Sequence, residues 1–251
     1  YNVAVGGYTL SVNTTGYWNT AVGDSVLTSN TSGSRNAAFG TDALMLNTTG
    51  WYNSAVGVEA LENNDSGDYN TAMGYDALNQ NISGSFNSAF GESALYNNTT
   101  GVRNSAFGEG ALSFNGTGSY NLAAGMEAGY NNVSGSSNVF LGYQAGYNET
   151  GSNKLYIGNS STTLPLIFGD FSTARVGIGT TTPYALLALS NSVSTTANTP
   201  LFAIASTTAG TATSTHFVVL ANGNVGIGTA APVQKLHIEG QCVTGDSLLP
   251  I

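Results

Sequence analysis

The sequence predicts an all-β protein in which residues 1–153 form a parallel β-roll or β-helix solenoid of about nine 17-residue coils. The first observation is that the stretch Asn-x-Ala-Val/Phe-Gly, with close variants, recurs at one interval. Its Asn stands at Asn2, Asn19, Asn36, Asn53, Asn70, Asn87, Asn104, Asn121 and Asn138. The second observation is that no insertion or deletion separates the nine copies. A constant period of this length is typical of stacked coils, each of which buries its apolar face only against its neighbours.

The third observation is a composition that differs from that of an ordinary globular domain. Charged residues make up 8% of the 251 residues, against roughly 25% in typical soluble domains. Hydrophobic residues, at 41%, are sufficient for a core. Gly, Asn, Ser and Thr occupy the remaining positions, so we expect a neutral surface rich in hydroxyl and amide groups. Such surfaces are common on extracellular fibres.

Charge and hydropathy exclude several classes of partner. The net charge of −9, with five Lys and Arg residues, argues against nucleic acid, because phosphate binding needs a basic surface. No apolar run reaches the length of roughly 18 residues that a membrane-spanning helix needs, so we expect no membrane span. The single Cys excludes an intrachain disulfide. Tyr1 occupies the repeat position that Trp18 and Tyr52 hold later, so we expect the chain to begin inside a longer repeat array.

We number the positions of each coil from the recurring Asn, which is position 1. Position 5 is Gly in all nine copies and position 15 in eight, and these glycines supply corner conformations that a Cβ would strain. The coil leaves room for two short strands and two turns. Ala and Val/Phe at positions 3 and 4, with Ala-Leu at positions 8 and 9, are expected to form a thin interior. Whether the Ala-Leu segment is a strand or one helical turn stays open.

Asparagine recurs at positions 1 and 12, and equivalent Asn side chains in successive coils are expected to form hydrogen-bonded ladders. Position 12 also begins an Asn-x-Ser/Thr sequon, as at Asn47 and Asn98. Turn chemistry explains these sequons without glycosylation.

Two variable columns flank the repeated core. Positions 6 and 7 carry an acid in seven of the nine copies: Asp24, Asp42, Glu59, Asp76, Glu92, Glu109 and Glu127. This acidic stripe is interpreted either as a solvated face that keeps rods apart or as a ladder for divalent cations, although it matches no calcium-loop pattern. Position 17 carries Trp18, Arg35, Tyr52, Tyr69, Phe86, Arg103 and Tyr120. Its aromatic members, Trp18, Tyr52, Tyr69, Phe86 and Tyr120, are interpreted either as corner or subunit packing or as a stripe that binds sugar or another surface.

A different pattern follows the repeats. We expect a connector at residues 154–171 and a second β region at residues 172–241, in which Val-Gly-Ile-Gly-Thr-x-x-Pro occurs at 176–183 and again at 225–232. Apolar strand candidates flank both copies, and residues 201–205 and 217–220 are expected to form a hairpin. The Gly-x-Gly pieces lack the third glycine and the Gly-Lys-Ser/Thr of nucleotide loops, so we predict no cofactor.

The repeats resemble the heads of trimeric autotransporter adhesins, whose β-roll has shorter coils, and equally the 17-residue repeats of phage tail-fibre and other bacterial surface-fibre proteins. The Val-Gly-Ile-Gly-Thr motifs are similar to segments of trimeric fibre stalks and tail-fibre shafts. The resemblance implies a homotrimer, with β structure interleaved around a threefold axis in the second region. A 17-residue coil agrees with this, since two or three apolar positions per coil need a partner chain to cover them.

Residues 242–251 depart from the fibre pattern. Cys242-Val243-Thr244-Gly245-Asp246 is similar to the opening of a Hint (hedgehog/intein) domain, or else belongs to a disordered tail. The Hint resemblance implies that Cys242 attacks the carbonyl of Gln241 and cleaves the chain there. A Hint domain needs well over a hundred further residues, including a downstream His, so these ten would be inactive by themselves.

The sequence therefore predicts a non-enzymatic, extracellular fibre subunit, on a cell surface or a virion, that attaches to a glycan or protein receptor. No Ser-His-Asp set or metal cluster is apparent, and His216 and His237 are isolated. One alternative is a phage tailspike that binds or cleaves glycans, because carboxylates about 4.8 Å apart would suit a retaining glycosidase. Another alternative is the N-terminal cargo of a self-processing Hint precursor.

Overall fold

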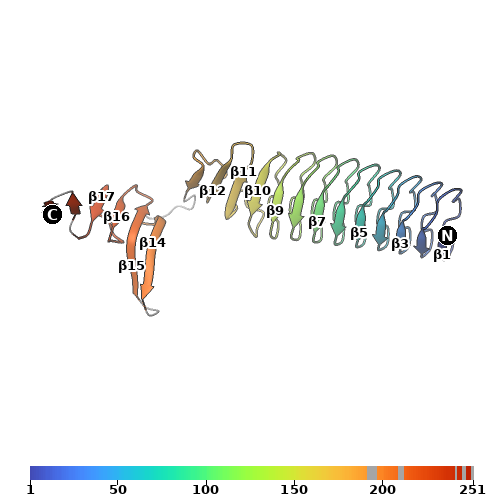
Figure 1. Cartoon of the computed structure of the whole chain (residues 1–251), viewed down its shortest axis with the longest axis horizontal. Helices are drawn as coiled ribbons and strands as arrows, with labels where there is room; N and C mark the ends of the chain where they lie inside the picture. Colours follow the sequence, from blue (N-terminus) through green and yellow to red (C-terminus); the bar gives the residue numbers. More distant parts are fainter. Residues whose placement is uncertain (191–196, 209–211, 241, 245–246, 250–251) are drawn as a thin grey trace. The chain divides into compact units, whose positions relative to one another are not determined.

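The computed structural model describes residues 1–190, 197–208, 212–240, 242–244 and 247–249. Over these residues the protein is all-β, and it contains no helix long and apolar enough to cross a membrane. The chain forms two compact units, residues 1–176 and 177–251, which are described separately. Figure 1 shows the strands of the first unit side by side in chain order.

The first unit is a parallel β-solenoid, as predicted. Nine three-residue strands, one per coil, pair with their neighbours in sequence order. Every strand residue lies opposite its equivalent in the next coil, as in Ala4↔Ala21 and Ala38↔Ala55. At roughly 4.8 Å per coil, nine coils span about 43 Å. The strands are β1 (Val3–Val5), β2 (Thr20–Val22), β3 (Ala37–Phe39), β4 (Ser54–Val56), β5 (Thr71–Met73), β6 (Ser88–Phe90), β7 (Ser105–Phe107), β8 (Leu122–Ala124) and β9 (Val139–Leu141).

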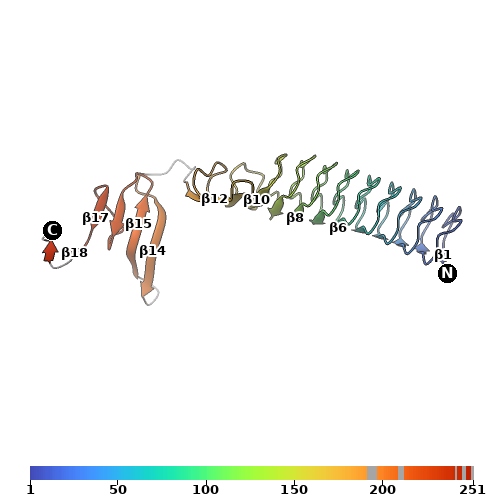
Figure 2. The same cartoon turned by 45° about the horizontal axis from the view of Figure 1, so that its top comes forward.

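The expectation of two strands per coil is wrong, because each coil contains one strand and a series of tight turns (Figure 2). The Ala-Leu segment is neither a strand nor a helical turn. Its Leu adopts a left-handed backbone, with φ of 50° at Leu27 and 55° at Leu61. That conformation costs roughly 1–2 kcal/mol for a residue with a Cβ. The strain persists because it turns the Leu side chain into the interior, where both leucines are fully buried.

The interior is thinner than the sequence suggested. It consists of the small strand residue at position 3 and the Ala-Leu pair, for example Ala55, Ala60 and Leu61. The Val/Phe of position 4 points outward instead, because successive side chains of a strand face opposite sides. Phe39 and Phe107 are 41% and 44% exposed. The assignment of position 4 to the core is therefore corrected.

The glycine at position 5 is required by close packing between coils. At Gly57, φ is 141°, and a Cβ would lie 2.3 Å from the carbonyl oxygen of Gly74 in the next coil. The same contact recurs along the column, so this glycine permits the backbone approach that sets the coil spacing.

In the last two coils, one phenylalanine takes the place of two core leucines. Gly129 and Gly146 stand where other coils have Leu, and Phe140 stands where they have Ala. A Cβ on Gly129 would lie 2.4 Å from the Phe140 ring, and one on Gly146 would lie 2.2 Å from it. One large ring therefore fills the space of two missing leucines.

A hairpin follows the last coil of the solenoid. β10 (Lys154–Ile157) continues the parallel sheet, and β11 (Ile167–Asp170) pairs with it antiparallel. Burial, together with a hydrogen bond to Glu149, raises the pKa of Tyr156, whose ring lies 6.0 Å from that of Phe140. Lys154 forms an ion pair with Asp170 at 3.0 Å. Hydrogen bonds from the Ser172 hydroxyl and from Lys154 lower the pKa of Asp170 to about 2.

The first Val-Gly-Ile-Gly-Thr motif begins at Val176, the last residue of the first unit, and the second motif lies entirely in the second unit. β12 (Arg175–Ile178) contains the start of the first motif, and β13 (Leu187–Leu189) follows that motif in the chain. A four-stranded sheet in the order β14-β15-β16-β17 contains the second. The hairpin predicted around residues 201–220 is confirmed as β14 (Pro200–Thr208) and β15 (Ala212–Leu220), followed by β16 (Val225–Ile227) and β17 (Leu236–Ile238). β18 (Cys242–Thr244) and β19 (Ser247–Leu249) form a separate antiparallel pair.

The two motifs form the same local structure. The amide of Ser190 donates to the carbonyl of Ile178 at 3.0 Å, and at the equivalent place in the second motif Glu239 donates to Ile227 at 2.9 Å. Each motif is thus a strand, a glycine turn and a return strand.

Candidate functional site

The Asn residues of position 1 join each coil to the next through side-chain-to-backbone hydrogen bonds. The Asn53 Oδ1 accepts from the backbone N–H of Asn70 at 2.9 Å, and its Nδ2 donates to the carbonyl of Gly67 at 2.8 Å. The same pair of bonds recurs from Asn19 to Asn121. The predicted ladder is therefore present, and it satisfies buried amides that would otherwise be costly.

The Asn residues of position 12 form a second ladder, from side chain to side chain. In each step the Nδ2 of one Asn donates to the Oδ1 of the Asn in the preceding coil, at 2.6–3.3 Å. The same Nδ2 also donates to the glycine carbonyl three residues later, as from Asn98 to Gly101 at 3.1 Å. The ladder runs through Asn13, Asn30, Asn47, Asn64, Asn81, Asn98, Asn115 and Asn132.

This ladder accounts for the Asn-x-Ser/Thr sequons. Asn47 and Asn98 are fully buried, and each side-chain nitrogen is engaged by two acceptors. An N-linked sugar has no space at such a nitrogen once the coils are stacked. The sequon therefore follows from a ladder Asn placed next to an exposed turn hydroxyl.

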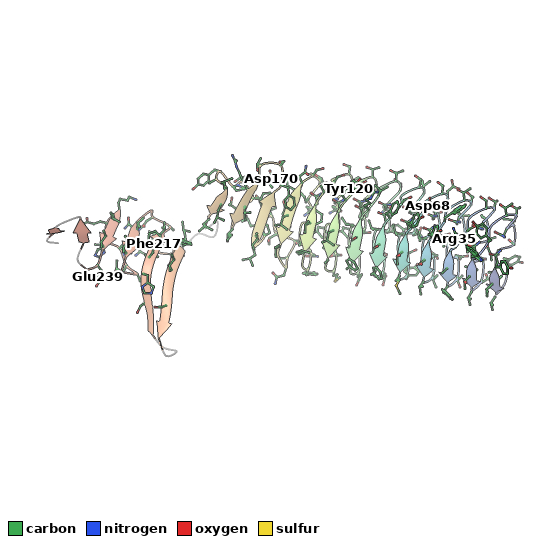
Figure 3. The ribbon with its side chains drawn as sticks, viewed as in Figure 1. Arg35, Asp68, Tyr120, Asp170, Phe217 and Glu239 are labelled. Atoms are coloured by element: carbon green, nitrogen blue, oxygen red, sulfur yellow. The ribbon has the colours of Figure 1, made fainter. Side chains whose placement is uncertain are left out.

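The aromatic residues of position 17 form a column on the solenoid surface. Tyr69 stacks on Tyr52 with ring centroids 4.7 Å apart and on Phe86 at 4.9 Å, with interplanar angles of 8° and 4°. Arg35 lies over the Tyr52 ring at 5.0 Å, and Arg103 lies over Phe86 at 5.1 Å. The column extends over Trp18, Arg35, Tyr52, Tyr69, Phe86, Arg103 and Tyr120. Figure 3 labels Arg35 and Tyr120, which lie toward opposite ends of this column.

Stacking determines what the column can offer a ligand. Both faces of the Tyr52, Tyr69 and Phe86 rings are covered by neighbours, so these residues present ring edges to solvent. Tyr120 ends the column, because the next residue at position 17 is Ser137. Aromatic and cation–π contacts of this kind contribute about 0.5–1.5 kcal/mol each. The column is therefore a stabilising spine whose outer edge remains exposed.

The acidic residues lie in two neighbouring rows. Asp42, Glu59, Asp76 and Glu127 occupy position 7, whereas Asp24, Glu92 and Glu109 occupy position 6. The structure brings four of them, Asp76, Glu92, Glu109 and Glu127, around one hollow of about 470 Å³. Tyr96, Phe114 and Tyr130 line the same hollow. Within the part of the chain that the structure describes, no group of three or more His, Cys, Asp or Glu side chains is placed to hold a metal ion.

Adjacent coils place like charges close together in these rows. The pKa of Glu59 is raised above its usual value. The largest cause is a hydrogen bond with Asp76, and burial and the neighbouring charges of Asp76, Glu62 and Asp42 add to it. A solvated column of carboxylates with neighbours of the same sign resists close approach by another acidic surface.

The outward stripe at position 4 is a feature that sequence reasoning placed in the core. We call it the strand-face stripe; it consists of Val5, Val22, Phe39, Val56, Met73, Phe90, Phe107, Ala124 and Leu141. It carries no charge, and Phe90 stacks on Phe107 at 5.2 Å. The signal that could have identified it is strand alternation, since Ala faces inward at position 3.

The remaining predicted residues lie in the second unit. Cys242 begins β18, whereas its proposed cleavage partner Gln241 lies outside the described residues, so the geometry of the proposed cleavage lies outside them too. His216 is hydrogen-bonded to Ser206 at 2.9 Å. His237 lies on β17.

The fold and these columns define the chain as a β-solenoid protein whose coils are joined by amide ladders and a stacked aromatic column. No family model, curated protein or solved structure matches the sequence or the fold.

Proposed function

We propose that the chain is a structural and adhesive subunit of an extracellular fibre, on a cell surface or a virion, in which copies associate as a homotrimer. The observation that supports this most directly is the uniform stacking of nine coils. Two asparagine ladders connect successive coils, and the aromatic column adds contacts from Trp18 to Tyr120, which makes a stiff spacer from a short repeat. The resemblance of the repeats to trimeric adhesin heads and to tail-fibre proteins points to the same role.

The exposed edge of the aromatic column is the proposed contact with a glycan or protein receptor. It runs the length of seven coils and combines ring edges with two guanidinium groups. A repeated edge of this kind suits an extended or repetitive surface rather than one small molecule.

Whole-cell and glycan-array binding by the full chain tests the proposal. The full chain should bind a surface glycan or protein, and replacing Trp18 and Tyr120 by Ala should weaken binding while the coils remain folded. Light scattering should give the mass of three chains. A monomer mass at all concentrations, or binding that is indifferent to these two residues, would contradict the respective part of the proposal.

A glycan-cleaving role is the second candidate, and the hollow lined by Asp76, Glu92, Glu109 and Glu127 is the observation that favours it. Carboxylates one coil apart approach the roughly 5–5.5 Å separation of a retaining glycosidase. Shortening of a surface polysaccharide by the full chain, abolished by Glu109→Gln, would establish it. The uniformity of the coils favours the fibre role over glycan cleavage. If the protein is only a fibre, the polysaccharide chains keep their length in this assay.

A further inference from the structure

The acidic hollow of the first unit interrupts an otherwise uniform surface. It is centred on the coil of residues 104–120, which has Gly110 at position 7 and Ser113 at position 10, where the two neighbouring coils have larger side chains. A Cβ on Gly110 would lie 3.4 Å from both Glu127 and the Tyr130 ring, so a longer side chain there would occupy part of the hollow. The hollow therefore results from two small residues in one coil, without any insertion.

Position 10 is a column of tyrosines from which one ring is missing. Tyr130 and Tyr147 stack in adjacent coils with ring centroids 5.0 Å apart and an interplanar angle of 6°. Ser113 occupies the next place in this column, and Tyr96 occupies the place beyond it. We call the space between Tyr96 and Tyr130 the tyrosine slot; Phe114, whose ring centroid is 5.0 Å from that of Tyr130, lines it as well. Two coil steps of roughly 4.8 Å separate the two tyrosines, so a group centred in the slot lies within the roughly 6 Å of each ring at which cation–π attraction acts.

The charged groups around the slot all have one sign. Four carboxylates line the hollow, and no Lys, Arg or His is among the residues that line it. Within the described part of the chain, the side chains of Glu92 and Glu109 take part in no hydrogen bond or ion pair. A cation in the slot gains from the aromatic rings and from the carboxylates together, whereas a neutral sugar leaves the carboxylates uncompensated.

Ser113 indicates which kind of cation fits the slot. Its side chain lines the hollow and is only 5% exposed, and its hydroxyl has no hydrogen-bond partner among the residues that the structure describes. The hydroxyl oxygen is therefore available to accept a hydrogen bond from a ligand. An ammonium group that carries N–H can donate this bond, but a quaternary ammonium group of the choline type cannot.

The carboxylates also indicate more than one positive charge. Asp76, Glu92, Glu109 and Glu127 come from four successive coils, so they span three coil steps, on the order of 14 Å. A single ammonium group cannot contact carboxylates at both ends of such a span. A linear chain with several ammonium groups can, and its methylene groups can lie along the aromatic rings as lysine stems lie along apolar surfaces.

We propose that this hollow binds a linear aliphatic polyamine, with one ammonium group in the tyrosine slot beside Ser113 and the others along the carboxylates. The inference does not depend on the fibre role, because it uses neither the position-17 column nor the association of copies. It assigns the hollow a different ligand from the glycan of the second candidate function.

Isothermal titration calorimetry of the full chain with spermidine tests the proposal. Low ionic strength is used, because salt screens the attraction between exposed charges. Wild type should bind one spermidine per chain and should bind choline at least tenfold more weakly, since choline has one charge and no N–H group on its nitrogen. Absence of spermidine binding, or equal affinities for spermidine and choline, would overturn the proposal.

Two variants at Ser113 test the slot and leave every charge in place. Ser113→Tyr supplies the missing ring and should weaken spermidine binding at least tenfold, whereas Ser113→Ala removes only the hydroxyl and should weaken it about three- to tenfold. Thr28→Tyr makes the corresponding change at position 10 of a coil outside the hollow and should leave the affinity unchanged. Wild-type affinity in Ser113→Tyr would mean that spermidine merely adsorbs to the acidic rows, and the inference would be wrong.

A matched pair of carboxylate variants provides a test that does not require Ser113→Tyr to fold. Glu109→Gln and Asp24→Asn each remove one position-6 carboxylate and change the net charge equally, but only Glu109 lines the hollow. Glu109→Gln should weaken spermidine binding about threefold, and Asp24→Asn should have a smaller effect than that. Equal losses in the two variants would contradict a site at the hollow. None of these outcomes changes the mass or the receptor binding that test the fibre role.

Discussion

The position-12 ladder makes a quantitative prediction at Asn98. Its Nδ2 donates to Asn81 Oδ1 at 2.8 Å and to Gly101 at 3.1 Å, and its Oδ1 accepts from Asn115 at 3.0 Å. The Asn98 Oδ1 also accepts a longer bond from the Asn104 Nδ2, at 3.5 Å. Replacing Asn98 by Ala removes these four bonds. The Gly101 carbonyl oxygen still accepts a hydrogen bond from the Asn87 Nδ2 at 2.8 Å. The Asn81 oxygen and one N–H of Asn115 are left buried and unpaired.

Each buried unpaired group costs about 1–3 kcal/mol, so Asn98→Ala should reduce the free energy of unfolding by about 4 kcal/mol. Asn98→Asp keeps the shape but directs a carboxylate oxygen at two acceptors, and it should be more destabilising still. In a solenoid each coil contacts only its neighbours, so the loss should be concentrated in the coils around Asn98.

The adjacent Asn97 is the matched control. It is half-buried and lies outside the ladder, so Asn97→Ala should cost less than about 1 kcal/mol. Urea unfolding followed by circular dichroism gives the two free energies, and hydrogen exchange locates the affected coils. If the two alanine variants differ by less than about 0.5 kcal/mol, which is the scatter of ordinary surface substitutions, the ladder is not a principal source of stability.

Three further predictions concern the rest of the first unit. Phe140→Ala should lower the free energy of unfolding of the first unit by about 3–5 kcal/mol. Adding Gly129→Leu should restore part of that loss, because it returns the core to the consensus Ala and Leu. A double variant no more stable than Phe140→Ala would refute the idea that one ring replaces the missing leucines. Tyr69→Ala removes two ring stacks and should cost about 1–3 kcal/mol in thermal or urea unfolding, whereas Tyr143→Ala, outside the column, should cost less than about 1 kcal/mol; equal losses would count against the spine. Because the pKa of folded Asp170 is about 2, below the roughly 3.9 of an unfolded Asp, its contribution is complete above pH 4 and is lost as pH falls toward 2. Asp170→Asn should therefore lower the unfolding midpoint at pH 5 but have little effect at pH 2, and an equal effect at both would contradict the assignment.

Much of the proposed site could be anticipated from position in the repeat. Any residue type that recurs with the 17-residue period must form a column once the coils stack, which predicted the Asn ladders and the alignment of Tyr52, Tyr69 and Phe86. The stacking of ring faces could not be predicted, because it depends on side-chain orientation at a corner. That orientation follows from a left-handed backbone at each aromatic residue, with φ of 57° at Tyr52 and 56° at Tyr69.

The all-β class, the parallel register and the number of coils follow from the sequence alone, because a strict period leaves one way to stack equivalent residues. Which side of each coil faces inward depends instead on tertiary contacts. Leu61 and Tyr69 both adopt positive φ, which intrinsic preference assigns to Gly or Asn, and the cost is offset by burial for one and stacking for the other. Local propensity cannot reveal such conformations, because the contacts that stabilise them come from neighbouring coils.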